Sequence, residues 1–477
     1  MKKTLTLAVS FVLFGSVLTP HAFASVKPGN KCSAQGQSKN WQGKKYTCVK
    51  SGKKLVWNKG VVGQKVTPTP TPSQTPQSTE PTPTSTPTAA PASINYVSPS
   101  EPSDSKELCK LIERNPRGLS AGFPLLPPQT TRKGTVKWAL IPVDFKDLPG
   151  EKDFRSRVDN EMKLLSEWFD STSDGKFKVE WVVADRWTTV PGVSSDYPLD
   201  KKTYVNNTPG GIKLFKEAMT AADSHFDFTN VQTVNFILPL NQNIANEGEN
   251  GFPWDLHVKE MKTNEGYISS FSFAGKHQTR NDKSLWNYWV HEFGHAMGIP
   301  HVGSSGPDPA PFGFLEIMGD QDGSTREMSG WNRYLAEWWS DDRIYCKDLK
   351  NLNKVEITLV PLSSNESGIK LAIVPLTPQK ALLLESRRAT KFSCKTKEPR
   401  NGVLAYVLDL TMGHGQDFLV PIYPSPQKPI ESATCNQERE RNTSNPMLGE
   451  GEKLNFEGIT VEVLMSRNFD QILVSKS

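Results

Sequence analysis

The sequence predicts an α+β protein in which a domain of alternating strands and helices is followed by a β-rich C-terminal domain. Two observations lead to this prediction. Apolar runs typical of buried strands alternate with segments of helical periodicity between residues 135 and 298. After residue 346, short alternating runs are separated by turn residues. A chain of 477 residues is long enough for two or three domains.

Residues 1–24 have the features of an export signal. Lys2 and Lys3 precede an apolar run that ends at Leu18 and is short for a membrane span, and small residues around Ala24 offer a cleavage site. We therefore expect a secreted, extracellular protein with no membrane segment after signal cleavage. An uncleaved membrane anchor is the open alternative.

Two segments separate the signal from the first large domain. Residues 25–65 form a small Cys- and Trp-containing module, in which Lys45–Val49 and Lys54–Trp57 alternate as short strands do. Binding to the cell wall and service as a spacer are equally open roles. Residues 66–104 are a Pro/Thr-rich linker, since proline fixes φ and removes a backbone donor.

The cysteines indicate disulfides, because their number is even in an exported chain and none has CxxC spacing. Many pairings are open. The one that keeps partners within a unit joins Cys32 to Cys48, Cys109 to Cys346, and Cys394 to Cys435.

The domain from 105 to 346 contains a regular series of expected elements. Strands are expected at 135–145, 176–183, 231–240 and 267–273, and helices at 154–169, 284–298 and 331–339. The domain from 347 to 477 is expected to hold strands at 355–360, 369–374, 381–385, 403–408 and 459–464.

The helix expected at 284–298 carries the residues on which a functional prediction rests. His291 and His295 lie four residues apart, so both imidazoles project from one helix face and can bind a single ion. Gly298 permits a left-handed turn that returns the chain and brings His301 to the same ion. Zn²⁺ favours such nitrogen ligands and leaves a position for water in catalytic sites. Glu292 is placed to take a proton from the attacking water as general base.

The combined spacing resembles a known signature. His291-Glu292-Phe293-Gly294-His295-Ala296-Met297-Gly298-Ile299-Pro300-His301 is similar to the HExxHxxGxxH motif of metzincin zinc peptidases. The resemblance implies a catalytic domain with a twisted mixed sheet and an active-site helix, and a Met-turn for which Met318 is the match. Segments 143–147, 173–177 and 330–338 resemble secreted bacterial peptidases of the immune-inhibitor-A type, and the likeness covers roughly residues 109–410.

The chain departs from those relatives at two positions. His301 stands where many of them have an aspartate ligand, and Asp320 stands where some metzincins have a tyrosine. The residue that stabilises the oxyanion is therefore unassigned, and Tyr334 and His277 are the candidates considered. His225, His257 and His414 have no partners at metal-ligand spacing and are expected to have no functional role. A Ca²⁺ site among Asp144, Asp147, Asp320 and Asp322 is a further option, with solvated carboxylates as the alternative.

These observations predict a secreted zinc-dependent endopeptidase that acts on extracellular proteins or peptides. The alternative is a cell-surface or wall-binding protein with a structural or vestigial zinc site, and cleavage of wall peptides is a third option. A latency segment within 93–134, with Cys109 as a zinc cap, is also open. The formal net charge of +5 is small and no basic run alternates with aromatics, so no nucleic-acid partner is expected.

Overall fold

The computed structural model divides into two compact units, residues 1–89 and 90–477. It describes Lys31 and residues 38–41, 44–52, 54–59, 61–62, 97–116, 118–128, 130–197, 209–242, 262–268, 270–273, 284–303, 311–394, 401–429 and 444–477. The expected signal at 1–24 and most of the expected linker lie outside these residues. Among the residues described, no helix is both long enough and apolar enough to cross a membrane.

The first unit contains a small antiparallel sheet. Its strands are β1 (Ser38–Trp41), β2 (Lys44–Ser51), β3 (Lys54–Trp57) and β4 (Val61–Val62), with β2 pairing with the other three. Tyr46, Cys48 and Trp57 form its core. The expected tiny β unit is confirmed. Cys48 is disulfide-bonded, and its expected partner Cys32 lies outside the described residues.

The second unit begins with a parallel sheet in the order β6-β5-β8-β9, with β7 also paired to β5. The strands are β5 (Gly134–Asp144), β6 (Phe177–Val183), β7 (Thr188–Thr189), β8 (Val231–Ile237) and β9 (Ser270–Phe273). The sheet was expected to be mixed, but every described pairing is parallel. Helical crossovers explain this, because α1 (Arg155–Thr172) and α2 (Pro209–Asp223) return the chain to the same end of the sheet.

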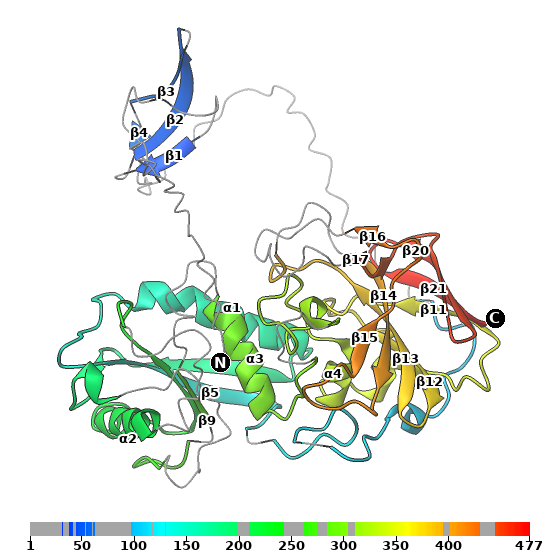
Figure 1. Cartoon of the computed structure of the whole chain (residues 1–477), viewed down its shortest axis with the longest axis horizontal. Coiled ribbons are helices and arrows are strands. Elements are labelled where there is room, and N and C mark those ends of the chain that lie inside the picture. The colour runs from blue at the N-terminus through cyan, green and yellow to red at the C-terminus, as the bar shows by residue number, and fades with distance from the viewer. Residues whose placement is uncertain are drawn as a thin grey trace, which may run out of the picture. The chain divides into compact units, whose positions relative to one another are not determined.

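The two faces of β5 belong to different cores. Val136, Trp138 and Leu140 pack with side chains of α1 and of α3 (Leu285–Ala296). The intervening Ala139, Ile141 and Val143 pack with side chains of α2. The alternation places α3 on the same face of the sheet as α1, and Figure 1 shows these two helices beside β5.

The C-terminal region is β-rich, as expected. One sheet has the order β10-β12-β13-β14-β15, with β18 also paired to β14, and the other has the order β11-β21-β20-β19. Their strands are β10 (Ile344–Cys346), β11 (Lys354–Leu359), β12 (Leu371–Thr377), β13 (Lys380–Arg387), β14 (Gly402–Asp409), β15 (Leu419–Pro421), β18 (Met447–Leu448), β19 (Lys453–Phe456), β20 (Ile459–Ser466) and β21 (Asp470–Lys476). A small pair joins β16 (Lys428–Pro429) to β17 (Ser444–Asn445).

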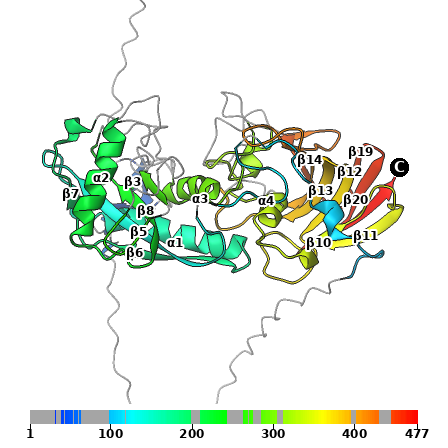
Figure 2. The same cartoon turned by 90° about the horizontal axis from the view of Figure 1, so that it is seen from below.

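The inner sheet of this region packs on both of its faces. Leu382 and Leu384 of β13 face the second sheet in one core. The alternate residue Leu383, with Tyr406 of β14, belongs to the core that also contains Trp138 and α3. The two sequence-predicted domains of this unit therefore share one hydrophobic core, and Figure 2 shows α4 (Gly330–Leu335) beside the inner strands.

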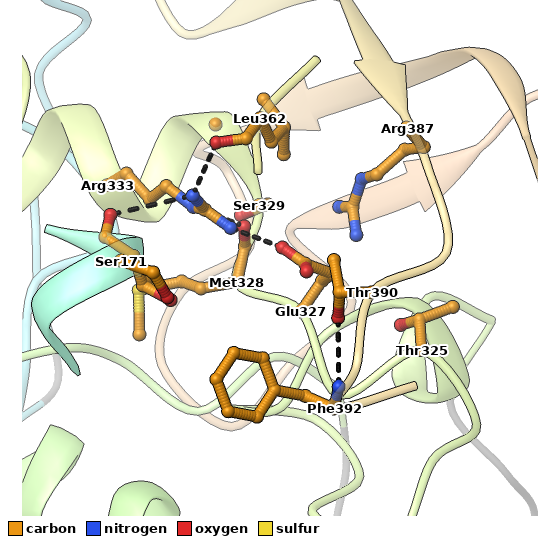
Figure 3. A network of polar contacts seen from close by, with 12 residues as sticks. Ser171, Thr325, Glu327, Met328, Ser329, Arg333, Leu362, Arg387, Thr390 and Phe392 are labelled. Carbon is orange, nitrogen blue, oxygen red and sulfur yellow. Dashed lines mark hydrogen bonds and ion pairs between the residues drawn. The ribbon is translucent and has the colours of Figure 1, made fainter. Parts of the chain in front are cut away.

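Polar and covalent links reinforce that core. The buried guanidinium of Arg333 donates to the carbonyl oxygens of Met328 and Leu362 and forms an ion pair with Glu327 (Figure 3). The Cys109–Cys346 disulfide joins η1 (Lys106–Cys109) to β10. That pairing confirms the expected one and excludes Cys109 as a zinc cap. Cys394 is also disulfide-bonded, and its expected partner Cys435 lies outside the described residues. The remaining short helices are η2 (Ser194–Asp196), η7 (Gly313–Leu315) and η8 (Asp341–Arg343).

Candidate metal centre

Helix α3 places His291, Glu292 and His295 in the interior of the second unit. Its N-terminus is held by a carboxylate of α1: the Glu161 Oε2 accepts the backbone N–H groups of Leu285 at 2.7 Å and Trp286 at 3.0 Å. The side chain of the N-cap residue Ser284 makes no capping bond. The helix is therefore positioned by a neighbouring element.

The turn after the helix has the conformation that the sequence predicted. Gly298 has a φ of +90°, which a residue with a Cβ adopts only under strain. The chain then reverses, so that the ring of His301 lies beside those of the helix. Ring centroids are 4.7 Å apart for His291 and His295, 5.3 Å for His291 and His301, and 5.7 Å for His295 and His301.

The three imidazoles are held in the same tautomer. The Nδ1–H of His291 donates to the carbonyl oxygen of Ile317 at 2.7 Å, that of His295 to Ile299 at 3.0 Å, and that of His301 to Gly303 at 3.0 Å. A carbonyl only accepts, so each proton lies on Nδ1 and each Nε2 carries a lone pair. Metal-binding histidines in proteins are commonly oriented in this way.

The pair on the helix matches the spacing of zinc ligands. The Nε2 atoms of His291 and His295 are 3.2 Å apart. Two nitrogens at about 2.0–2.1 Å from a tetrahedral zinc ion would be separated by roughly 3.3 Å. In the described part of the chain, no group of three or more His, Cys, Asp or Glu side chains is arranged so that it could hold a metal ion. The fit to zinc therefore rests on this pair and on the shared tautomer of three neighbouring rings.

Met318 packs directly against the helix. A Cβ added at Gly294 would lie 2.5 Å from the Met318 Sδ, and Met318 is fully buried. The same segment supplies the Ile317 carbonyl that orients His291, and the carbonyl of Met318 accepts the N–H of Val302 at 3.0 Å. The segment around Met318 thus contacts both the helix and the chain that carries His301.

The carboxyl group of Glu292 is buried on the same helix, with 3% of the residue exposed. Its Oε2 has no hydrogen-bond partner among the described residues. Burial raises the pKa of Glu292 to about 8, since a charged carboxylate is disfavoured where water is excluded. Burial also lowers the pKa of His295 well below its usual value, which keeps that ring neutral as a metal ligand must be.

His414 belongs to this site, although the sequence analysis treated it as ordinary. Its Nδ1 accepts the backbone N–H of His301 at 2.9 Å, and its ring centroid is 5.9 Å from that of His295. His414 lies in a loop of the C-terminal region, 113 positions after His301. No spacing in the sequence signals a contact between residues so far apart.

The other candidates are used elsewhere or lie outside the described residues. The hydroxyl of Tyr334 donates to Asp341 at 2.9 Å, and the Nε2 of His225 lies 3.2 Å from the Thr188 hydroxyl. His257 and His277 lie outside the described residues. The acidic residues considered for Ca²⁺ accept hydrogen bonds from protein groups. The donors are the N–H of Gly150 for the Asp144 Oδ2, the N–H and hydroxyl of Ser194 for Asp147, the N–H of Asp322 for the Asp320 Oδ1, and the Asn287 side chain for the Asp322 Oδ1.

Comparisons with known proteins give limited similarity. No protein-family model and no curated protein matches the chain. Among solved structures, wild-type OgpA from Akkermansia muciniphila is 13% identical, with a TM-score of 0.26, and the match covers 72% of this chain and 92% of that one. Catalytically inactive OgpA in complex with an O-glycopeptide substrate is 12% identical, with a TM-score of 0.24 and coverage of 72% and 93%. Similarities of this size do not assign the chain to a family.

Proposed function

We propose that the chain is a secreted zinc-dependent endopeptidase that hydrolyses peptide bonds of extracellular proteins or peptides. The observation that supports this most is the common orientation of three imidazoles, each with its Nδ1 bonded to a backbone carbonyl. His291, His295 and His301 would hold the zinc ion through Nε2. The resemblance to the metzincin signature agrees with this ligand set, with Met318 as the Met-turn residue.

The bound metal ion and Glu292 would have different roles in the reaction. Zinc, when bound, supplies a Lewis acid that polarises the scissile carbonyl and acidifies water. Glu292, ionised in the field of the bound cation, takes the proton from the attacking water and passes it to the nitrogen of the departing amine. The unpartnered Oε2 of Glu292 supports this role, because a carboxylate committed to an ion pair or hydrogen bond is a poorer proton carrier. Secretion rests on the export features of residues 1–24.

The decisive experiment combines metal content with cleavage of peptides. We expect the purified chain to contain about one equivalent of zinc and to cleave a casein-type substrate, with activity abolished by a chelator and restored by zinc. Glu292→Gln should retain zinc and lose about 10²–10⁴-fold in kcat. His291→Ala should lose the zinc itself.

A different outcome would favour the competing function. If the wild type and Glu292→Gln both hold zinc and are equally inert on protein, peptide and wall-peptide substrates, the chain is not a peptidase. The structural or vestigial zinc site of a cell-surface binding protein would then be the better description, with the module at 25–65 as the candidate wall-binding part.

A further inference from the structure

The loop between β14 and β15 runs along the segment that carries the third histidine. The N–H of Gly415 donates to the carbonyl of His301 at 3.0 Å, and the N–H of Gly303 donates to the carbonyl of Gln416 at 2.8 Å. Val302 and Gln416 form a parallel bridge. The C-terminal region therefore borders the candidate metal centre through backbone bonds, which fix the position of the loop residue His414.

His414 has the opposite tautomer from the other three histidines. Its Nδ1 accepts a hydrogen bond from the backbone N–H of His301, so that nitrogen carries a lone pair and the proton of the neutral ring lies on Nε2. A nitrogen that carries a proton has no lone pair for a metal. The site thus combines three rings that present lone pairs with one ring that presents a hydrogen-bond donor.

The ring of His414 lies slightly farther from His295 than the three candidate ligand rings lie from one another. Its centroid lies 5.9 Å from that of His295, compared with 4.7–5.7 Å among the three candidate ligands. The two rings are nearly perpendicular, at 86°. The described residues provide no acceptor for the Nε2–H of His414, which is only half-buried. Because the residue is partly exposed, this N–H is left to bond solvent or a bound ligand.

We propose that the Nε2–H of His414 donates a hydrogen bond to the carbonyl oxygen of the scissile peptide as negative charge develops on it. The proposal rests on the peptidase function proposed above and assigns the oxyanion-stabilising residue that the sequence left open. Asp320, at the position where some metzincins have a tyrosine, cannot donate such a bond as a carboxylate. The C-terminal region then supplies a catalytic residue as well as a supporting face.

Two variants separate donation from structural support. In His414→Asn, the Oδ1 can take the place of Nδ1 as acceptor for the His301 N–H, but no group reaches the position of Nε2. In His414→Gln, the longer side chain can bring an amide donor to that position. We expect His414→Asn to lose about 10²–10³-fold in kcat with KM changed little and zinc content unchanged, and His414→Gln to recover part of the loss.

An inhibitor test is sensitive to the oxyanion contact itself. A phosphinic peptide carries tetrahedral oxygens that imitate the reacting carbonyl, so its affinity should fall in His414→Asn in parallel with kcat/KM. If His414→Asn keeps its zinc and its kcat, or if it loses zinc, the proposed donation is wrong; the second result would mean that His414 supports or binds the metal. An inert wild type, or an active Glu292→Gln, would instead refute the peptidase function itself.

Discussion

At the scale of single residues, Gly294 shows why the helix accepts only a hydrogen at one position. The Sδ and Cε of Met318 lie where a β-carbon at Gly294 would meet them, at 2.5 and 2.7 Å. Met318 is fully buried, so it has little room to move away. Because the two segments lie so close, the carbonyl oxygen of Ile317 can accept the hydrogen bond from the Nδ1–H of His291.

Gly294→Ala should therefore destabilise the protein by about 1–3 kcal/mol and weaken zinc binding. Met318→Ala should cost about 2–5 kcal/mol by leaving a cavity. The double variant should lose less than the sum, because the added methyl group occupies the vacated space. Urea unfolding and zinc titration of the four proteins measure both effects, and strictly additive losses would contradict the contact.

The sequence could predict the local part of the site and not the distant part. His291, Glu292 and His295 follow from helical spacing, and Gly298 from the need to reverse the chain. His414 approaches only because the inner sheet of the C-terminal region packs in the same core as the helix and places the loop after β14 beside His301. The sequence shows a histidine at position 414, but it does not show that this histidine contacts His301.

At the scale of elements, α3 depends on α1 for its start. Two backbone N–H groups at the N-terminus of α3 bond to Glu161, and a carboxylate is favoured there by the helix dipole as well. The core face of α1 was visible in the sequence as helical periodicity, but this cap was not, because it joins residues 124 and 125 positions apart.

Glu161→Ala should consequently lower the free energy of unfolding by about 0.5–2 kcal/mol. Ser284→Ala is the matched control, since the Ser284 side chain makes no capping bond and its removal should cost less than about 0.5 kcal/mol. Chemical denaturation of both variants tests this. Equal losses, or a larger loss for Ser284→Ala, would show that the cap has been assigned to the wrong residue.

The expected strands were mostly found because buried and half-buried strands have simple patterns. The expected run at 135–145 became β5, and that at 403–408 became β14. Helix α2 was not expected, since it opens with Pro209, Gly210 and Gly211, which usually mark a loop. Parallel pairing of the β5–β9 sheet depends on such helical crossovers. Because α2 was not expected, the sequence offered no reason to predict that these strands are all parallel.

At the scale of the whole molecule, a buried ion pair links the two halves of the second unit. Lys370, just before β12, places its Nζ 2.7 Å from the Asp174 carboxylate, which follows α1. Burial lowers the pKa of Lys370 to about 8 although Asp174 favours the charged form, and the nearby Arg333 and Arg343 add to the lowering.

This shift predicts a pH dependence of stability. Between pH 8 and pH 10.5 the unfolded chain binds more protons at Lys370 than the folded chain does, so the contribution of Lys370 to stability rises with pH in that window. The unfolding free energy of the wild type relative to Lys370→Met should increase by up to about 1.4 kcal/mol per pH unit. Lys354→Met, at an exposed site, is the control for the loss of charge. A flat or falling difference for Lys370→Met would contradict the shift.

The Cys109–Cys346 bond closes a loop of chain that contains the entire parallel sheet of the second unit, all three candidate ligands and Glu292. A protease that cuts once anywhere inside this loop, including a second copy of the same molecule, would leave two fragments still covalently joined. Such a nicked species would migrate as a single band in a non-reducing gel and separate only when a thiol is added. Self-digestion within this loop would therefore not be detected by electrophoresis or another size measurement made without a reducing agent.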